Sequence, residues 1–142
     1  MSLRRKAREL ALQCFYQSEL SGQPAEETFV FFCDHFEVNK KAVPYARELV
    51  LGVAGHLDEI DRQIQAHAAN WRISRMSVID RNILRLATFE LCYQQGVPAS
   101  VAINEALEIA KRYSTDEAAP FINGILDAIK KSVLADQESV NK

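Results

Sequence analysis

The residues at the start of the chain combine positive charge with an aromatic ring. Four cations lie within the first eight positions, at Arg4, Arg5, Lys6 and Arg8. The apolar residues that follow recur every three or four positions, which predicts an α-helix over 3–20. The opposite face of this helix, predicted to point away from the core, carries Arg5, Arg8, Leu12 and Tyr16. Guanidinium groups bind phosphates and a tyrosine ring stacks on bases, so this face is predicted to bind the phosphates and bases of a nucleic acid.

The charge of the chain is distributed unevenly. Its formal net charge is −2 and its isoelectric point is about 5.9. Four of the 17 Lys and Arg residues lie in the first eight positions, and all 19 Asp and Glu residues follow them. An acidic protein is not expected to coat nucleic acid non-specifically, but a focused basic site remains compatible with this balance.

The sequence contains no pattern typical of an enzyme or a metalloprotein. The five glycines are isolated, so no glycine-rich phosphate loop is formed. Cys33 and His35 are a close pair, but no further ligands follow at the spacing of a zinc site. We therefore predict no catalytic residue, no metal site and no cofactor.

Cysteine usage and hydropathy indicate the compartment. The cysteines are odd in number, at Cys14, Cys33 and Cys92, which favours reduced thiols. No apolar run approaches the roughly 18–20 residues that span a bilayer, and no secretory signal follows the basic start. These features predict a cytoplasmic protein without a membrane contact.

The periodicity is helical almost throughout, which predicts an all-α fold. After the first helix, Gly22 and Pro24 mark a turn into a second helix. Further helices are expected over about 44–69, 78–94 and 99–113, and a last one starts between 115 and 121 and frays from about 136. Three helices before Trp71 and about three after it predict two subdomains, 1–70 and 71–142, with six to seven helices in total.

Two groups of aromatic residues are assigned to packing. Phe29, Phe32, Cys33 and Phe36 recur at helical spacing and are predicted to form core. Trp71 lies in a connector that breaks the helical period, and its ring is predicted to be tucked into one subdomain.

Several segments, covering about half of the chain, resemble the NusB family of transcription antitermination factors. The first segment begins Arg4-Arg5-Lys6-Ala7-Arg8-Glu9 and runs on to Tyr16-Gln17. The second is Asp80-Arg81-Asn82-Ile83-Leu84-Arg85-Leu86-Ala87. The third contains Val101-Ala102-Ile103-Asn104-Glu105-Ala106-Leu107-Glu108-Ile109-Ala110-Lys111 and continues into Phe121-Ile122-Asn123-Gly124-Ile125-Leu126-Asp127.

The resemblance implies both a fold and a binding function. NusB-like proteins are two packed three-helix bundles that pair with a small-subunit ribosomal protein, called NusE in this role. The pair binds the boxA element of nascent RNA, joins the antitermination complex on RNA polymerase and supports transcription of ribosomal RNA operons. The residues assigned to RNA are Arg4, Arg5, Lys6, Arg8, Tyr16, Lys111, Phe121 and Asn123, and Asp80 aligns with an acidic position of the surface that faces NusE.

Other interpretations stay open at this point. The stretch 114–120 departs from the family because no basic residue directly precedes Phe121. NusB-like domains also occur as accessory modules of ribosomal RNA methyltransferases. A third interpretation is a helical protein-interaction adaptor without RNA binding. The sequence also leaves open whether the free protein forms a homodimer.

Overall fold

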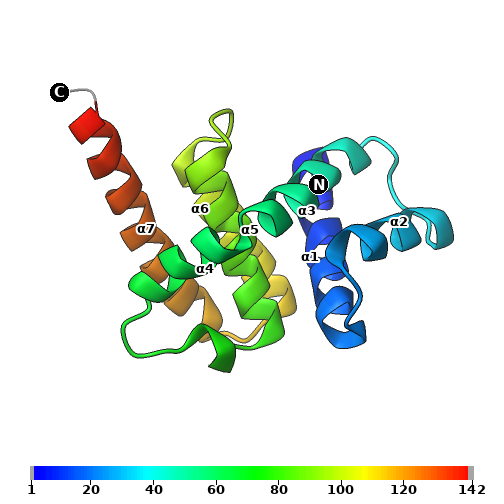
Figure 1. Cartoon of the computed structure of the whole chain (residues 1–142), viewed down its shortest axis with the longest axis horizontal. Helices are drawn as coiled ribbons and strands as arrows, with labels where there is room; N and C mark the ends of the chain where they lie inside the picture. The colour runs from blue at the N-terminus through cyan, green and yellow to red at the C-terminus, as the bar shows by residue number, and fades with distance from the viewer. Residues whose placement is uncertain (1, 141–142) are drawn as a thin grey trace. The chain divides into compact units, whose positions relative to one another are not determined.

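The chain folds into helices that form two compact units. The computed structural model describes residues 2–140, and within them it contains seven α-helices, a short 3₁₀-helix and no strand (Figure 1). The units divide between Leu57 and Asp58. This division precedes the expected one at residue 70, because almost all of the fourth helix is grouped with the second unit.

The first unit is a bundle of three helices. Its members, α1 (Leu3–Ser21), α2 (Ala25–His35) and α3 (Val43–Gly55), all pack against one another. The Ser2 hydroxyl caps α1 by accepting a hydrogen bond from the Arg5 amide at 3.1 Å. The predicted glycine stop is confirmed at Gly22, which adopts a φ of 77°. The bundle core is built from Ala7, Leu10, Ala11, Cys14, Phe15, Phe29, Ala46, Leu49, Val50 and Val53.

The single helix predicted over 44–69 is wrong, because the chain breaks at His56. There α3 ends, and α4 (Leu57–Ala66) begins directly afterwards. The His56 amide bonds to both the Gly52 and the Val53 carbonyl, at 3.1 and 3.3 Å. Gly52 and Gly55 each lower helix propensity by up to about 1 kcal/mol, so the helix is weakest where it stops.

The second unit is built around a buried helix. After α4 come the 3₁₀-helix η1 (Ile73–Arg75), α5 (Val78–Tyr93), α6 (Ala99–Tyr113) and α7 (Ala118–Val140). Helices α5, α6 and α7 all pack against one another, as Figure 1 shows. Helix α5 is largely buried, with Ile83, Leu84, Leu86, Ala87 and Phe89 in the core. Helix α7 starts at Ala118, within the predicted limits, with Pro120 in its first turn. It continues to Val140, whereas the sequence predicted fraying from about 136.

Arginines of α5 fix the segments that precede it. The Arg85 guanidinium donates two hydrogen bonds to Asp61 of α4, at 2.8 Å from Nε and 2.9 Å from Nη2. Arg81 donates from Nη1 to the Ile73 and Met76 carbonyls, both at 3.2 Å. Both the fourth helix and the connector after it are therefore held by side chains of α5.

Two aromatic assignments of the sequence analysis are wrong. Phe29 is buried as predicted, but the side chain of Phe36 is 55% exposed and that of Trp71 is 54% exposed. Phe36 falls just outside the packed face because α2 ends at His35. Trp71 lies in a turn, where its amide bonds to the Ala68 carbonyl at 3.0 Å. Among the described helices, none has the length and apolar character to cross a membrane.

The Arg85–Asp61 pair predicts a clear stability difference. Asp61→Ala leaves a largely buried guanidinium without its bidentate partner, so we expect it to lower the free energy of unfolding by about 1–3 kcal/mol. Asp127→Ala removes the exposed pair with Lys131 and is the matched control, with an expected loss of at most about 0.5 kcal/mol. Urea unfolding followed by circular dichroism measures both, and equal losses would contradict the role of the pair.

Candidate nucleic-acid interface

The first turns of α1 present positive charge next to an aromatic ring. Arg4 and Lys6 are exposed and Arg5 is partly exposed. The Arg4 guanidinium carbon lies 4.4 Å from the centroid of the Tyr45 ring of α3, a cation–π contact. No acidic residue occupies the first turn of α1, where the helix dipole is positive. This end of α1 is therefore suited to bind an anion.

Tyr45 was missed by the sequence analysis. It lies in the first turn of α3, outside the apolar positions from which that helix was predicted. The signal that could have found it is an aromatic residue off the apolar face, directly after Pro44. Only the packing of α3 against α1 brings its ring to the arginines.

The predicted solvent-facing side of α1 is not wholly exposed. Only 3% of Arg8 and 2% of Leu12 is exposed, whereas Tyr16 on the same predicted face is exposed. The Arg8 guanidinium carbon lies 5.9 Å from the Tyr45 ring centroid, so it faces the same ring as Arg4. The prediction of a fully exposed face was wrong because α1 is buried on more than its one apolar stripe. Arg8 consequently supports the basic surface from beneath.

The remaining predicted residues lie in the second unit, where two of them share a cavity. Asp80 of α5 and Phe121 of α7 line a cavity of about 240 Å³, together with Trp71, Arg75, Met76, Ser77, Thr115, Glu117 and Ala118. The Trp71 and Phe121 rings meet edge to face, with centroids 5.8 Å apart. The Asp80 carboxylate accepts a hydrogen bond from the Ser114 hydroxyl at 2.5 Å. The cavity thus has an aromatic wall, two carboxylates from Asp80 and Glu117, and one guanidinium group from Arg75.

Lys111 and Asn123 do not line this cavity. Both side chains are exposed, Lys111 in the last turn of α6 and Asn123 in α7. The Lys111 ammonium group lies 3.4 Å from a carboxylate oxygen of Glu108. An exposed pair of this kind is weak and leaves the ammonium accessible to solvent.

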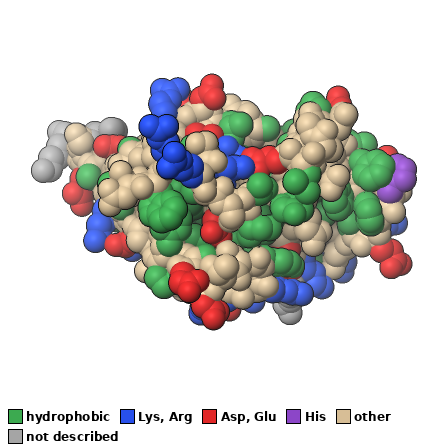
Figure 2. Space-filling model, turned by 90° about the horizontal axis from the view of Figure 1, so that it is seen from below, with side chains coloured by type: hydrophobic (Ala, Val, Ile, Leu, Met, Phe, Trp, Pro, Cys, Tyr) green, Lys and Arg blue, Asp and Glu red, His purple; other side chains and the backbone are tan. Residues whose placement is uncertain are grey.

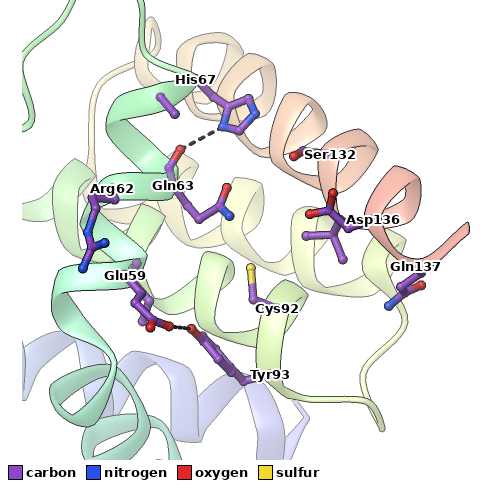
Figure 3. A pocket seen from close by; sticks show the side chains of 12 residues that line it. Glu59, Arg62, Gln63, His67, Cys92, Tyr93, Ser132, Asp136 and Gln137 are labelled. Carbon is purple, nitrogen blue, oxygen red and sulfur yellow. Dashed lines mark hydrogen bonds between the residues drawn. The ribbon is translucent and has the colours of Figure 1, made fainter. Parts of the chain in front are cut away.

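A larger cavity of about 830 Å³ lies between α4, α5 and α7, and no predicted site residue lines it (Figure 3). The Tyr93 hydroxyl donates to a Glu59 carboxylate oxygen at 2.6 Å. This hydrogen bond, reinforced by burial, raises the pKa of Tyr93 to about 12. Burial also raises the pKa of the Cys92 thiol. Both groups are protonated at neutral pH, so neither is an activated nucleophile.

No group of three or more His, Cys, Asp and Glu side chains among the described residues is placed to hold a metal ion. The cavity in Figure 3 contains no such group and a single histidine. This histidine, His67, directly follows α4 and is hydrogen-bonded from Nδ1 to the Gln63 carbonyl of that helix at 2.8 Å.

Comparison with known proteins assigns the family. The model of the NusB family matches residues 5–131. The chain belongs to the NusB family. It is 51% identical over 136 residues to the "Transcription antitermination protein NusB" of Desulfotalea psychrophila, covering 92% of this chain and 96% of that protein. The predicted family membership is confirmed.

Solved structures of the NusB family share this fold. NusB of T. maritima superposes with a TM-score of 0.82 at 38% identity, covering 90% of each chain. A crystal structure of "Antitermination Factors NusB and NusE in complex with dsRNA" superposes with a TM-score of 0.82 at 32% identity, covering 93% of this chain and 98% of that one. The predicted all-α class is confirmed.

The burial of Arg8 gives it a structural role that Lys6 does not have. Arg8→Ala removes a packed stem and a cation near the Tyr45 ring, so we expect a loss of about 1–3 kcal/mol in unfolding free energy. Lys6→Ala changes an exposed side chain of the same helix and is expected to stay within about 0.5 kcal/mol of the parent. Thermal and urea unfolding compare the two, and a stable Arg8→Ala variant would contradict this role.

The raised pKa of Tyr93 predicts a pH effect. Between about pH 10 and 12 the unfolded chain loses the phenolic proton while the folded chain keeps it. Stability should therefore fall as the pH rises through this window, and less steeply in Tyr93→Phe. The phenolate absorbance of the parent minus that of Tyr93→Phe isolates the titration of Tyr93. In Glu59→Gln, which removes the negative charge, that titration should shift to lower pH, and an unchanged midpoint would refute the assigned cause.

Proposed function

We propose that this chain is a transcription antitermination factor that binds RNA jointly with the ribosomal protein NusE. The observation that carries the proposal is the exposed basic start of α1, where Arg4 lies against Tyr45. The first turn of α1 holds no acid that would neutralise the positive end of the helix dipole. The names of the similar proteins support it, since one is a transcription antitermination protein and another was solved with NusE and RNA. The function is binding, without catalysis, in the cytoplasm.

The first unit would contact the RNA backbone and one base. Arg4, Arg5 and Lys6 would bind phosphates, which a guanidinium group contacts in a bidentate manner. The exposed ring of Tyr16 would stack on a base, a contact typically worth about 1–3 kcal/mol. Arg8 would act mainly by holding the Tyr45 ring in place beneath Arg4. The RNA is proposed to be the single-stranded boxA element.

The second unit would supply the NusE contact and further RNA contacts. Asp80 and Glu117 in the lining of the small cavity would attract a basic protein surface, so Asp80 is assigned to NusE. The exposed Lys111, Asn123 and the edge of Phe121 would extend the RNA surface. Joint binding would then recruit the chain to the antitermination complex on RNA polymerase during transcription of ribosomal RNA operons.

Charge neutralisation at the start of α1 tests the RNA site. Arg4→Gln with Lys6→Gln should weaken boxA RNA binding by about tenfold or more, measured with and without NusE. Each phosphate contact on a single strand contributes about 0.7 to the slope of log affinity against log salt concentration, so that slope should become shallower by roughly 1.4. Both side chains are exposed, so the fold is expected to stay intact.

The matched control removes two exposed cations elsewhere in the same unit. Lys40→Gln with Lys41→Gln changes the net charge equally but leaves α1 untouched. RNA affinity should stay near that of the parent. Equal losses in the two double variants would show that only overall charge matters and would refute the proposed site.

A further inference from the structure

Helix α2 is apolar on two sides. Its inner side buries Thr28 and Phe29 in the first unit. Its outer side carries Val30 and Phe31, exposed by 47% and 50%, and Phe36 follows at 55%. Helices that border solvent normally expose a polar face, and exposed apolar groups that cluster mark interaction surfaces. These three side chains form what we call the α2 patch.

The aromatic rings around this patch are already ordered. Phe31 stacks on His35 with centroids 4.2 Å apart, and Phe36 stacks on Phe32 at 4.9 Å. Phe31 and Phe36 meet edge to face at 6.2 Å, which joins the two stacks. Rings held by their neighbours lose little conformational entropy when a partner covers them. The α2 patch is thus a preorganised surface of the kind that anchors protein interfaces.

The charges beside the patch are negative. Residues 26–37 contain Glu26, Glu27, Asp34 and Glu37, all exposed, and no Lys or Arg. The exposed Arg47 of α3 has its guanidinium carbon 5.9 Å from the ring centroid of the buried Phe29. Figure 2 shows hydrophobic side chains gathered beside a His side chain at the right of the view, where α2 lies, with Asp and Glu side chains close by.

These charges decide which occupant fits. Carboxylates repel RNA phosphates, so the patch differs in kind from the basic start of α1. A second copy docked symmetrically would place Glu27, Asp34 and Glu37 against the same acids, which disfavours a dimer through this face. A basic protein segment is not repelled by these carboxylates in either way.

We infer that the α2 patch is a docking surface for a basic amphipathic segment of a protein partner. Aliphatic or aromatic side chains of that segment cover Phe31 and Phe36, while its Lys and Arg side chains pair with Glu27, Asp34 and Glu37. None of the residues proposed to bind RNA belongs to the patch. The inferred surface is therefore separate from the residues proposed to bind RNA and from Asp80, the residue assigned to NusE.

The test uses two synthetic probes with the full chain. One is a fluorescent amphipathic helix of Leu and Lys, and the other is its Leu and Glu counterpart of equal length. Fluorescence anisotropy should show preferential binding of the Leu/Lys peptide. Phe31→Ser with Phe36→Ser should weaken this binding by about tenfold or more, because it removes both aromatic anchors. Glu27→Lys with Asp34→Lys keeps every ring and should shift the preference to the Leu/Glu peptide.

The control replaces exposed apolar side chains elsewhere. Val101→Ser with Leu134→Ser changes residues of α6 and α7 with similar exposure, and peptide binding should not change. Equal peptide affinity in parent, Phe31→Ser/Phe36→Ser and charge-reversed variants would overturn the inference. A dimer seen by light scattering that Phe31→Ser/Phe36→Ser dissolves would overturn it in favour of a second copy.

RNA binding separates this inference from the proposed function. Phe31→Ser/Phe36→Ser leaves the net charge unchanged, so it should bind boxA RNA with the affinity of the parent, whether or not the parent affinity proves high. A loss of RNA affinity on Phe31→Ser/Phe36→Ser would assign the patch to RNA and overturn the inference. Failure of the Arg4/Lys6 experiment, by contrast, would leave the peptide result unaffected.

Discussion

The second unit depends on a buried helix, α5, from which three charged side chains reach neighbouring segments. The guanidinium of Arg85 reaches Asp61 of α4, that of Arg81 reaches the connector around η1, and Asp80 accepts from Ser114 at the end of α6. Burying charged groups is costly unless they are paired, so these contacts can form in few other arrangements. The contacts of α5 thus also set the wall of the small cavity where Trp71 meets Phe121.

The charge pattern assigns different surfaces to different partners. The start of α1 is basic and backed by Tyr45, whereas the outer side of α2 is apolar and flanked by acids. Both surfaces lie in the first unit, so the net charge of that unit describes neither surface. Electrostatic complementarity acts over about a Debye length, some 8–10 Å, so surfaces only a few helical turns apart can attract opposite partners.

The helical class and most helix limits followed from local rules. Ser77 capping α5 and Gly22 ending α1 are local backbone effects that a single sequence reveals. The break at His56 was foreseeable in principle, since Gly52 and Gly55 weaken the helix there. It was missed because apolar periodicity continues across both glycines, and periodicity reports which residues face a core but not whether the backbone bends.

The candidate site, too, could be predicted only in part from the sequence. The sequence by itself determined the cations of α1, the helical class and the NusB resemblance, because composition, spacing and motif order are properties of the chain alone. Only the tertiary structure decided that Arg8 is buried, that Tyr45 backs Arg4 and that Phe36 and Trp71 are exposed. Exposure depends on which helices pack against a given face. Contacts between segments far apart in the sequence determine that packing.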